Sequence, residues 1–523
     1  MTAPPSAPAV HAPRLAPLAL HPDRFLDPEP SVRRVARALH EGTRELPLVC
    51  PHGHVEPRLL AEDAPFPEPT ALLVTPDHYV YRMLHSQGVR MEALGVPTRD
   101  GTPVEGDPRQ VWRRFAAHRH LFLGTPTGIW LDHVLHELFG VRVQLAAASA
   151  DRVYDQIAER LADAAFRPRA LFERFGIAVL ATTDAAHDDL RHHRAIRASG
   201  WAYGAARVVP TFRPDALLRI ADPGWPDARA ALAAVHGRPI DTQAALVQAL
   251  AERRLAFRAH GATATDHAVV EPYTAPLAPD AAEALFRRAA AGTATAADQR
   301  AYEGHMLVEM ARLSCEDGLV MQLHPGALRD HHGAVARRFG PDRGADIPVA
   351  TEFTRNLRPL LEAHGDDPRL TLVLFTLDES AYARELAPLA GHYPAVRLGP
   401  PWWFHDSLEG MRRFREQVTE TAGIWNTAGF NDDTRAFCSI PARHDLARRL
   451  DASWLAGLVA RHVVTLEEAH GMARALAHDL AWDTYRFAGA VPPPGASPAR
   501  SVGSGDPSAR AHGAASAEAA PCS

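Results

Sequence analysis

Six short apolar runs, separated by helical patterns, limit the folds that this sequence can adopt. The runs lie at residues 46–50, 177–182, 207–211, 319–323, 370–376 and 395–398. Their apolar residues are continuous rather than alternating, which is typical of parallel strands covered on both faces. Helical periodicity lies between them, for example at residues 152–164, 167–174, 406–421 and 465–487. Repeated βα units predict a parallel sheet, either a closed (β/α)8 barrel or an open doubly wound sheet.

Polar residues follow four of these runs at the point where each strand would end. They are Pro-His-Gly-His after residue 50, Thr-Asp after 182, Phe-Arg-Pro-Asp after 211 and His-Pro-Gly after 323. Catalytic residues contributed by the carboxyl ends of many strands are the signature of a barrel. The first run lacks a glycine-rich dinucleotide turn, which disfavours the open sheet. We therefore predict an α/β fold, a (β/α)8 TIM-type barrel with helical insertions.

The barrel is expected to span residues 19–489, with helical insertions at about 55–150 and 221–301. Both ends of the chain differ in composition from the part between them. Residues 1–18 are rich in alanine and proline, and residues 490–523 have almost no large apolar side chain. Segments that bury so little surface cannot offset their ordering entropy, so we expect two disordered tails.

Charge and cysteine content exclude several classes of protein. The 523 residues carry 56 basic and 62 acidic side chains, and this net charge of −6 gives no reason to expect a nucleic-acid or membrane partner. No run approaches the roughly 18 apolar residues that a membrane helix needs. Every basic residue is arginine, so pyridoxal-phosphate and aldolase Schiff bases, P-loops and a carboxylated lysine bridging two metals are excluded. Four scattered cysteines suit a reducing cytoplasm.

His52 and His54 follow the first apolar run and are the first candidates for metal binding. In an extended segment residues i and i+2 point the same way, so both imidazoles can converge on one ion. Asp433 or its neighbour Asp432, late in the chain, would complete a His-His-Asp site with open positions. A carboxylate here could equally act as a proton-transfer base or as a helix N-cap, and we expect one aspartate to cap while the other is functional.

Three further segments carry candidate functional side chains. Asp77 opens an amphipathic helix and can cap it, whereas His78 and Tyr79 are candidates for proton transfer. Arg213 ends a predicted strand just before a proline, which is typical of a carboxylate clamp, with a salt bridge to Asp215 as the alternative.

His324 also ends an apolar strand, which favours ligand or substrate contact over core packing. Trp402 and Trp403 are adjacent aromatic residues that could form either part of the core or a sugar-binding wall. Other histidines occur in helical segments and are interpreted as solvated or structural; they lie at positions 133, 136, 192, 193, 331 and 332.

Taken in order along the chain, these segments resemble the uronate isomerase (glucuronate isomerase) family of the amidohydrolase superfamily. The similar segments lie between about residue 24 and residue 488. They are HGH at 52–54, DHYVYR at 77–82, GIWLDHVLHELFGV at 128–141, ATTD at 181–184, TFRPD at 211–215, MQLHPGALR at 321–329, WWF at 402–404, DDTRAF at 432–437 and IPARHD at 440–445. The chain departs from the family pattern in having Ala-Ala-His after ATTD, where Asp-Pro is typical.

The resemblance implies a (β/α)8 barrel and the aldose–ketose isomerisation of hexuronates, through a cis-enediol. The expected reactions convert D-glucuronate to D-fructuronate and D-galacturonate to D-tagaturonate. It also implies the mononuclear branch of the superfamily, with one divalent metal, zinc first and manganese or iron as alternatives, that is not necessarily essential. The expected partner is a small hexuronate, and whether the barrel forms a homo-oligomer is left open.

The resemblance assigns a role to each candidate residue. The metal is expected on His52, His54 and Asp433, with Asp433 also as the catalytic base. The remaining residues are catalytic or bind substrate: Tyr79, His78 and Arg435 stabilise charge or return the proton, Arg213 holds the substrate carboxylate, and His324, Trp402 and Trp403 contact the substrate.

Two alternative functions stay open from the sequence. One is a mononuclear metal-dependent hydrolase of the amidohydrolase superfamily, acting on a sugar-acid lactone or amide. The other is a non-catalytic barrel, which the number of polar strand ends disfavours.

Overall fold

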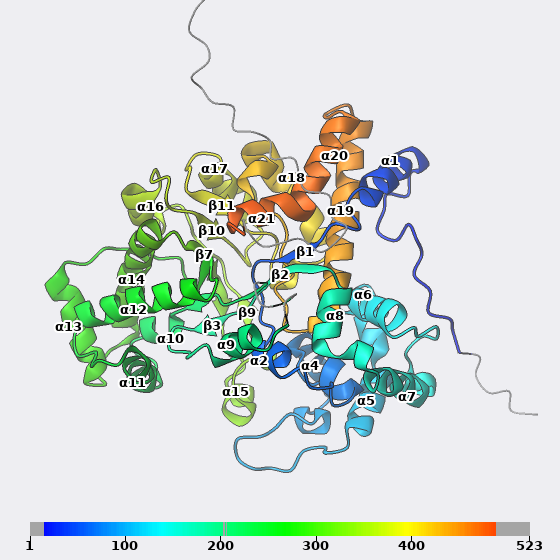
Figure 1. Cartoon of the computed structure of the whole chain (residues 1–523), viewed down its shortest axis with the longest axis horizontal. Helices are drawn as coiled ribbons and strands as arrows, with labels where there is room; N and C mark the ends of the chain where they lie inside the picture. Colours follow the sequence, from blue (N-terminus) through cyan, green and yellow to red (C-terminus); the bar gives the residue numbers. More distant parts are fainter. Residues whose placement is uncertain (1–14, 202–203, 205–206, 488–523) are drawn as a thin grey trace, which may run out of the picture.

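The computed structural model describes residues 15–201, 204 and 207–487, whose strands form the wall of a (β/α)8 barrel (Figure 1). The wall consists of β1 (Leu48–Cys50), β2 (Ile177–Ala181), β3 (Asp184–Ala185), β4 (Val208–Val209), β5 (Phe212–Arg213), β6 (Ala264–Val269), β7 (Val320–Pro325), β10 (Leu372–Leu374) and β11 (Val396–Leu398). These strands pair in parallel, in the orders β1-β2-β4 and β3-β5-β6-β7-β10-β11. Because β3 continues β2 and β5 continues β4, neighbours in the wall are also successive in the chain, as in a TIM barrel.

The wall returns to its first strand through the segment after β11. Thr427 forms a parallel bridge with Leu398 of β11. Farther along the same segment, the Thr434 carbonyl oxygen accepts a 3.0 Å hydrogen bond from the His54 N–H, just beyond β1. We call this contact between residues 427–434 and the end of β1 the seam of the barrel. It brings Asp433 next to the histidines that follow β1.

Alternation along the strands divides the apolar side chains between two layers. The side chains of one buried cluster come from successive strands and fill the barrel, among them Val49, Val179, Val209, Val320 and Val373. Their neighbours in sequence pack instead against the surrounding helices, among them Met321, Leu323, Leu372, Leu374, Val396 and Leu398. Burial of both faces explains why the strands are continuous apolar runs in the sequence.

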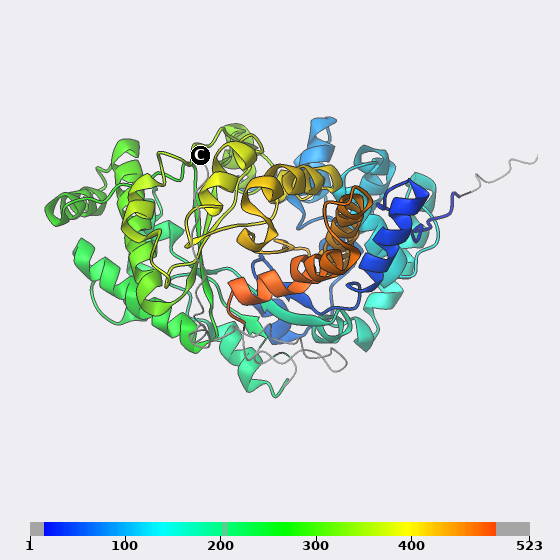
Figure 2. The ribbon, with the colours of Figure 1, turned by 90° about the horizontal axis from the view of Figure 1, so that it is seen from above.

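Helices cover the outside of the wall and extend it on two sides (Figures 1 and 2). Those before β4 are α1 (Pro30–Glu41), α2 (Pro57–Glu62), α3 (Pro69–Leu73), α4 (His78–Ser86), α5 (Pro108–Ala117), α6 (Pro126–His133), α7 (Ala150–Leu161), α8 (Pro168–Arg174) and α9 (Arg191–Ala198). The later ones are α10 (Asp215–Leu218), α11 (Trp225–His236), α12 (Gln243–Ala259), α13 (Pro279–Ala290), α14 (Ala296–Asp317), α15 (Gly333–Phe339), α16 (Arg358–His364), α17 (Ala387–Ala390), α18 (Leu408–Ala422), α19 (Ile440–Ala460), α20 (Leu466–Arg474) and α21 (Leu480–Thr484). A short hairpin of β8 (Ala327–Leu328) and β9 (Ile347–Pro348) follows β7.

All six apolar runs coincide with strands, but the expected helical insertion at 221–301 needs a correction. It contains strand β6, which pairs with β7 over its full length. The sequence of this strand, ATDHAV, has no large apolar residue, and Asp266 and His267 interrupt any apolar run. Residues 55–150 are largely helical between β1 and α7, as the sequence predicts.

The two predicted tails fall mostly on residues 1–14 and 488–523, which lie outside the described residues. Residues 15–18 were also expected to be disordered, yet they pack against the protein. Pro17 forms an antiparallel bridge with Val143, and the buried Leu18 donates its N–H to the Arg142 carbonyl oxygen. Among the described helices, none is long and apolar enough to cross a membrane.

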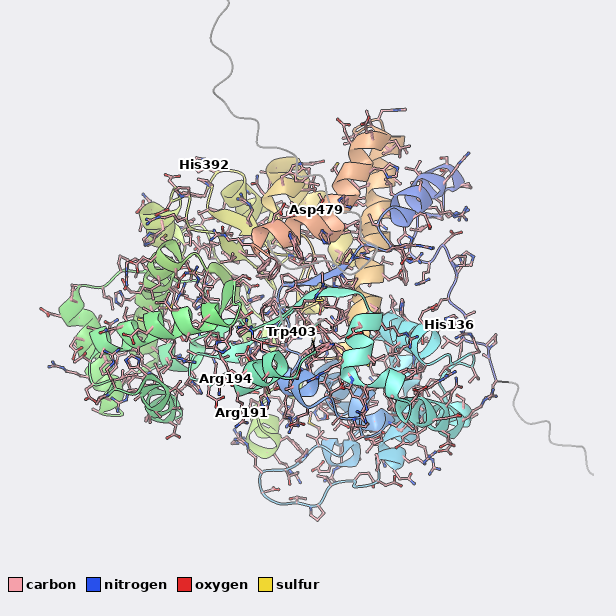
Figure 3. The ribbon with its side chains drawn as sticks, viewed as in Figure 1. His136, Arg191, Arg194, His392, Trp403 and Asp479 are labelled. Atoms are coloured by element: carbon pink, nitrogen blue, oxygen red, sulfur yellow. The ribbon has the colours of Figure 1, made fainter. Side chains whose placement is uncertain are left out.

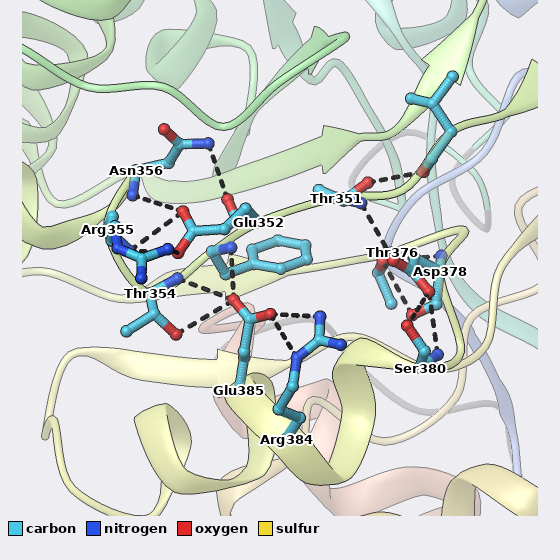
Figure 4. A network of polar contacts seen from close by, with 12 residues as sticks. Thr351, Glu352, Thr354, Arg355, Asn356, Thr376, Asp378, Ser380, Arg384 and Glu385 are labelled. Atoms are coloured by element: carbon cyan, nitrogen blue, oxygen red, sulfur yellow. Dashed lines mark hydrogen bonds and ion pairs between the residues drawn. The ribbon is translucent and has the colours of Figure 1, made fainter.

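Two carboxylates, the buried Glu385 and the half-buried Asp378, connect the loops that follow β9 and β10 (Figure 4). The Glu385 carboxylate accepts hydrogen bonds from the N–H groups of Phe353 and Thr354, at 2.7 and 2.9 Å. The Asp378 carboxylate accepts one from the Thr351 N–H at 3.0 Å. These bonds hold the segment after β9 to the segment after β10, so the loops at the mouth of the barrel are fixed relative to each other.

Gly429, in the segment that completes the wall, leaves no room for a side chain. Its φ is +75°, and a Cβ atom there would lie 2.8 Å from the Ala481 backbone nitrogen. We expect Gly429→Ala to destabilise the protein by about 2 kcal/mol, measured as a lower midpoint of thermal unfolding. Gly457→Ala, on an open face of α19, is the control and should be neutral or slightly stabilising. Equal midpoints for the two variants would contradict this packing argument.

Candidate active site at the carboxyl end of the barrel

A cavity of about 400 Å³ lies at the carboxyl end of the strands, a size suited to a small molecule. Most of the side chains singled out in the sequence line it, namely His54, His78, Tyr79, Arg213, Trp402, Trp403, Asp433 and Arg435. Trp403 lies near the middle of the molecule, whereas His136, interpreted as solvated or structural, lies towards its edge (Figure 3). His136 pairs there with Glu137 at 2.9 Å.

Three side chains, of which Asp433 lines this cavity, are arranged to bind a metal ion. His52, His324 and Asp433 each place one potential ligand atom within 4.8 Å of the others. The imidazoles of His52 and His324 stack with centroids 4.6 Å apart, and His52 Nε2 lies 3.5 Å from Asp433 Oδ1. His54 approaches the same oxygen, at 3.3 Å, but is not part of this tight group. The structure thus brings together the predicted histidine and aspartate and adds His324, which the sequence indicated only as a substrate contact.

The remaining contacts of these side chains leave the right atoms available for a metal. His324 Nδ1 is 2.7 Å from a carboxylate oxygen of Asp266. His324 Nε2 and Asp433 Oδ1 are buried without a hydrogen-bond partner within the described part of the chain. A histidine held through one nitrogen by a carboxylate, with the other nitrogen free, is the usual arrangement of a metal ligand. The residues therefore fit a divalent cation.

Burial sets the protonation states of this group. It lowers the pKa of His52, and lowers that of His54 to about 3, so both imidazoles are neutral, as metal ligands must be. Burial opposes the charge of Asp433, but the positive charge that the facing imidazoles of His52 and His54 carry when protonated holds the pKa of this carboxyl below its usual value. Asp433 is therefore ionised near neutral pH.

Asp266 is a residue that the sequence reasoning missed, and its position leads to a prediction. Because it orients His324, Asp266→Asn should weaken metal binding by about 10- to 100-fold. Competition with a chromophoric chelator measures this change directly. Asp346→Asn, the same change on another buried carboxylate of the cavity wall, is the control and should retain wild-type affinity. If both variants bind metal as the wild type does, Asp266 has no positioning role.

Arg213 forms both of the contacts that the sequence left as alternatives. Its Nε lies 2.7 Å from an Asp215 oxygen and 3.5 Å from an Asp266 oxygen, while its side chain lines the cavity. Although burial opposes the charge, Asp215 and Asp266 raise the pKa of this guanidinium above its usual value. Since Nε faces the two aspartates, the rest of the fork can bind an anion.

His78 and Tyr79 begin helix α4, which Asp77 caps as predicted by accepting a 2.8 Å hydrogen bond from the Tyr79 N–H. Their rings stack with centroids 4.6 Å apart. The Tyr79 hydroxyl donates to the Trp403 carbonyl oxygen at 3.2 Å. Trp403 itself has a φ of +53°, a strained conformation for an aromatic residue, and Arg329 lies 4.8 Å over its ring.

The structure separates the roles of the two late aspartates. Asp433 lines the cavity, with a φ of +34°, whereas Asp432 is buried away from it and faces His444 at 3.4 Å. Neither aspartate caps a helix, so this prediction was wrong. The next helical turn begins after Ala436, three residues beyond Asp433, and Ala436 occupies its N-cap position. Arg435 lines the cavity and pairs with Asp342 at 2.5 Å.

The fold and this cavity define an enzyme of the (β/α)8 class that acts on a small molecule at the carboxyl end of its strands. Residues 28–485 match the family model of glucuronate isomerase. The chain therefore belongs to the glucuronate isomerase family, as the sequence motifs indicated.

Relatives and solved structures agree with this assignment. The uronate isomerases of Nostoc punctiforme and Rhizorhabdus wittichii are 53% and 54% identical over 469 and 472 residues, which cover 90% of this chain and 98% and 99% of theirs. The crystal structure of glucuronate isomerase from Caulobacter crescentus superimposes with a TM-score of 0.88 at 49% identity, covering 90% of this chain and 98% of that one. Uronate isomerase from Thermotoga maritima gives 0.82 at 26% identity, with coverages of 89% and 99%.

Proposed function

We propose that this member of the glucuronate isomerase family interconverts D-glucuronate and D-fructuronate, and D-galacturonate and D-tagaturonate. The observation that carries the proposal is the placement of the ionised Asp433 and the guanidinium of Arg213 in one cavity. An open-chain hexuronate has a carboxylate at one end and an exchangeable C2 proton near the other. The hydrolase alternative has no observation in its favour beyond the shared barrel.

Asp433 is the proposed base, and the reaction needs only proton transfers. The C2–H bond breaks, its proton passes to the Asp433 carboxylate, and its electron pair forms the C1–C2 double bond. The C1=O π pair moves to O1, which takes up a proton to complete the cis-enediol. Return of a proton to C1 and loss of the hydroxyl proton at O2 then give the ketose. Tyr79, His78 and Arg435 line the same cavity and would stabilise the charge at O1 or return the proton.

Arg213 would hold the substrate carboxylate and so fix the position of C2. A guanidinium binds a carboxylate in a fixed orientation, so this contact also places the reacting carbon correctly relative to the base. Trp402 and Trp403 form the part of the wall that would contact the sugar carbons.

His52, His324 and Asp433 would hold a divalent metal, with His54 as a further ligand, and zinc is the first choice because neutral imidazoles and a carboxylate suit it. When bound, such a cation polarises substrate oxygens. Asp433 presents Oδ1 to the histidines, so its second oxygen is the one proposed to take the proton. The same proposal places the enzyme in the cytoplasm, where free cysteines stay reduced.

A proton NMR time course in D₂O tests the proposal. Purified protein is incubated with D-glucuronate, and then with D-galacturonate, with and without added zinc or manganese. We expect the ketose to appear together with deuterium at the carbon that receives the proton. The absence of both product and exchange with either substrate would reject the proposal, and release of an acid from a lactone without exchange would favour the hydrolase.

A further inference from the structure

A second group of potential metal ligands lies behind the cavity, at the seam of the barrel. Cys50 ends β1, Asp432 belongs to the segment that closes the wall, and His444 lies in the second turn of α19. One ligand atom from each lies within 4.8 Å of the others, and all three residues are almost completely buried. None of them lines the active-site cavity, and none belongs to the group of His52, His324 and Asp433.

The polar atoms of this cluster converge: His444 Nε2 contacts the Cys50 sulfur and pairs with Asp432, yet the hydrogen-bonding capacity of the Asp432 carboxylate stays unused by the residues that the structure describes. Neither carboxylate oxygen of Asp432 has a hydrogen-bond partner within the described residues, although its side chain is fully buried. One nitrogen, His444 Nε2, faces both the Cys50 sulfur and the Asp432 carboxylate. A buried carboxylate that lacks hydrogen bonds is costly, and such groups in native proteins usually pair with a cation or ligate a metal.

The distances between these atoms match the edges of a tetrahedral zinc site. Zinc bonds of about 2.0 Å to nitrogen and oxygen and about 2.3 Å to sulfur place N and O about 3.3 Å apart, and S and N about 3.5 Å apart, each within about 0.2 Å of the distances found here. In the structure, His444 Nε2 lies 3.4 Å from Asp432 Oδ1 and 3.7 Å from Cys50 Sγ. A thiolate and a carboxylate together also balance the charge of a divalent cation.

We propose that Cys50, Asp432 and His444 bind a second, structural zinc ion. The ion connects the first strand, the closing segment and helix α19, which meet at the seam. Cys50 precedes His52 by two residues, and Asp432 is adjacent to Asp433. A metal at this position therefore also fixes the backbone from which His52 and Asp433 extend towards the active site.

Metal titration of the full-length protein tests this proposal independently of activity. Protein stripped with a chelator is reloaded with zinc and its metal content is measured, and in parallel it is loaded with Co²⁺ as a spectroscopic probe. We expect two zinc ions per chain and a near-ultraviolet thiolate-to-cobalt charge-transfer band, which only a cysteine ligand produces. Absence of this band would overturn the proposal, whereas one ion per chain with the band would keep it and contradict the metal proposed for the active site.

Matched variants assign the band to the cluster. Cys50→Ser should lose the band and one metal ion, whereas Cys438→Ser, at a buried cysteine outside the cluster, should keep both. His52→Gln alters only the active-site group and should keep the band. A band that persists in Cys50→Ser would show that the ion binds elsewhere. If Cys50→Ser does not fold, two measurements still test the proposal. They are the number of metal ions bound by the wild type and the presence of the cobalt band in Cys438→Ser.

Discussion

Replacing Asp433 by asparagine should lower kcat by about 10²- to 10⁴-fold, which is the usual contribution of a positioned general base. The amide has the shape of the carboxylate but cannot accept the C2 proton near neutral pH. The side chain is buried between His52 and His54, so an isosteric change should leave the fold intact. Steady-state kinetics and deuterium incorporation at C1 of the ketose measure the loss, and circular dichroism verifies the fold.

Metal loss could mimic this effect, so the metal content of the variant is measured as well. Turnover that stays low with excess metal points to the missing base. Asp330→Asn is the control, because Asp330 is another carboxylate of the cavity wall whose N–H bonds to Asp346, and its turnover should stay near wild type. If Asp433→Asn keeps most of its turnover, Asp433 is not the base.

Replacing Arg213 by glutamine should lower kcat/KM for hexuronates by about 10²- to 10³-fold. Truncating one partner of a buried charge pair commonly costs 2–5 kcal/mol, and here it also leaves Asp215 and Asp266 without their cation. Because the carboxylate contact positions C2, both KM and kcat should worsen.

The preference for an acidic substrate distinguishes loss of the Arg213–carboxylate contact from a general distortion of the active site. The wild type should strongly prefer D-glucuronate to D-glucose, and Arg213→Gln should lose most of this preference. If the variant keeps the preference, another cationic residue of the cavity, such as Arg219 or Arg329, holds the carboxylate instead.

The barrel could be predicted from the sequence because most of its strands are buried on both faces. One strand of the wall escaped that reasoning. Strand β6 has small and polar residues, so its place in the wall depends on its neighbours β5 and β7 and not on a local pattern.

The candidate site was predicted in part for a similar reason. Polar residues at recognised strand ends, such as His52 and Arg213, could be found from their position alone. Asp266 could not, because its strand was not recognised, although a charged residue within a buried segment is a signal in itself. Which of Asp432 and Asp433 faces the cavity depends on the local backbone, where Asp433 has a φ of +34°. Two adjacent aspartates in the sequence do not reveal this conformation.

The seam has a consequence for when the enzyme can become active during its synthesis. The His54–Thr434 hydrogen bond joins residues from the two ends of the barrel, and Asp433 lies beside it. His52 and His54 leave the ribosome early, but the proposed base is added only after the other strands of the wall have been made. A chain interrupted between residues 324 and 433 therefore carries the metal-binding histidines without the base. We expect such nascent fragments to be inactive until the wall closes, whatever structure they have already formed.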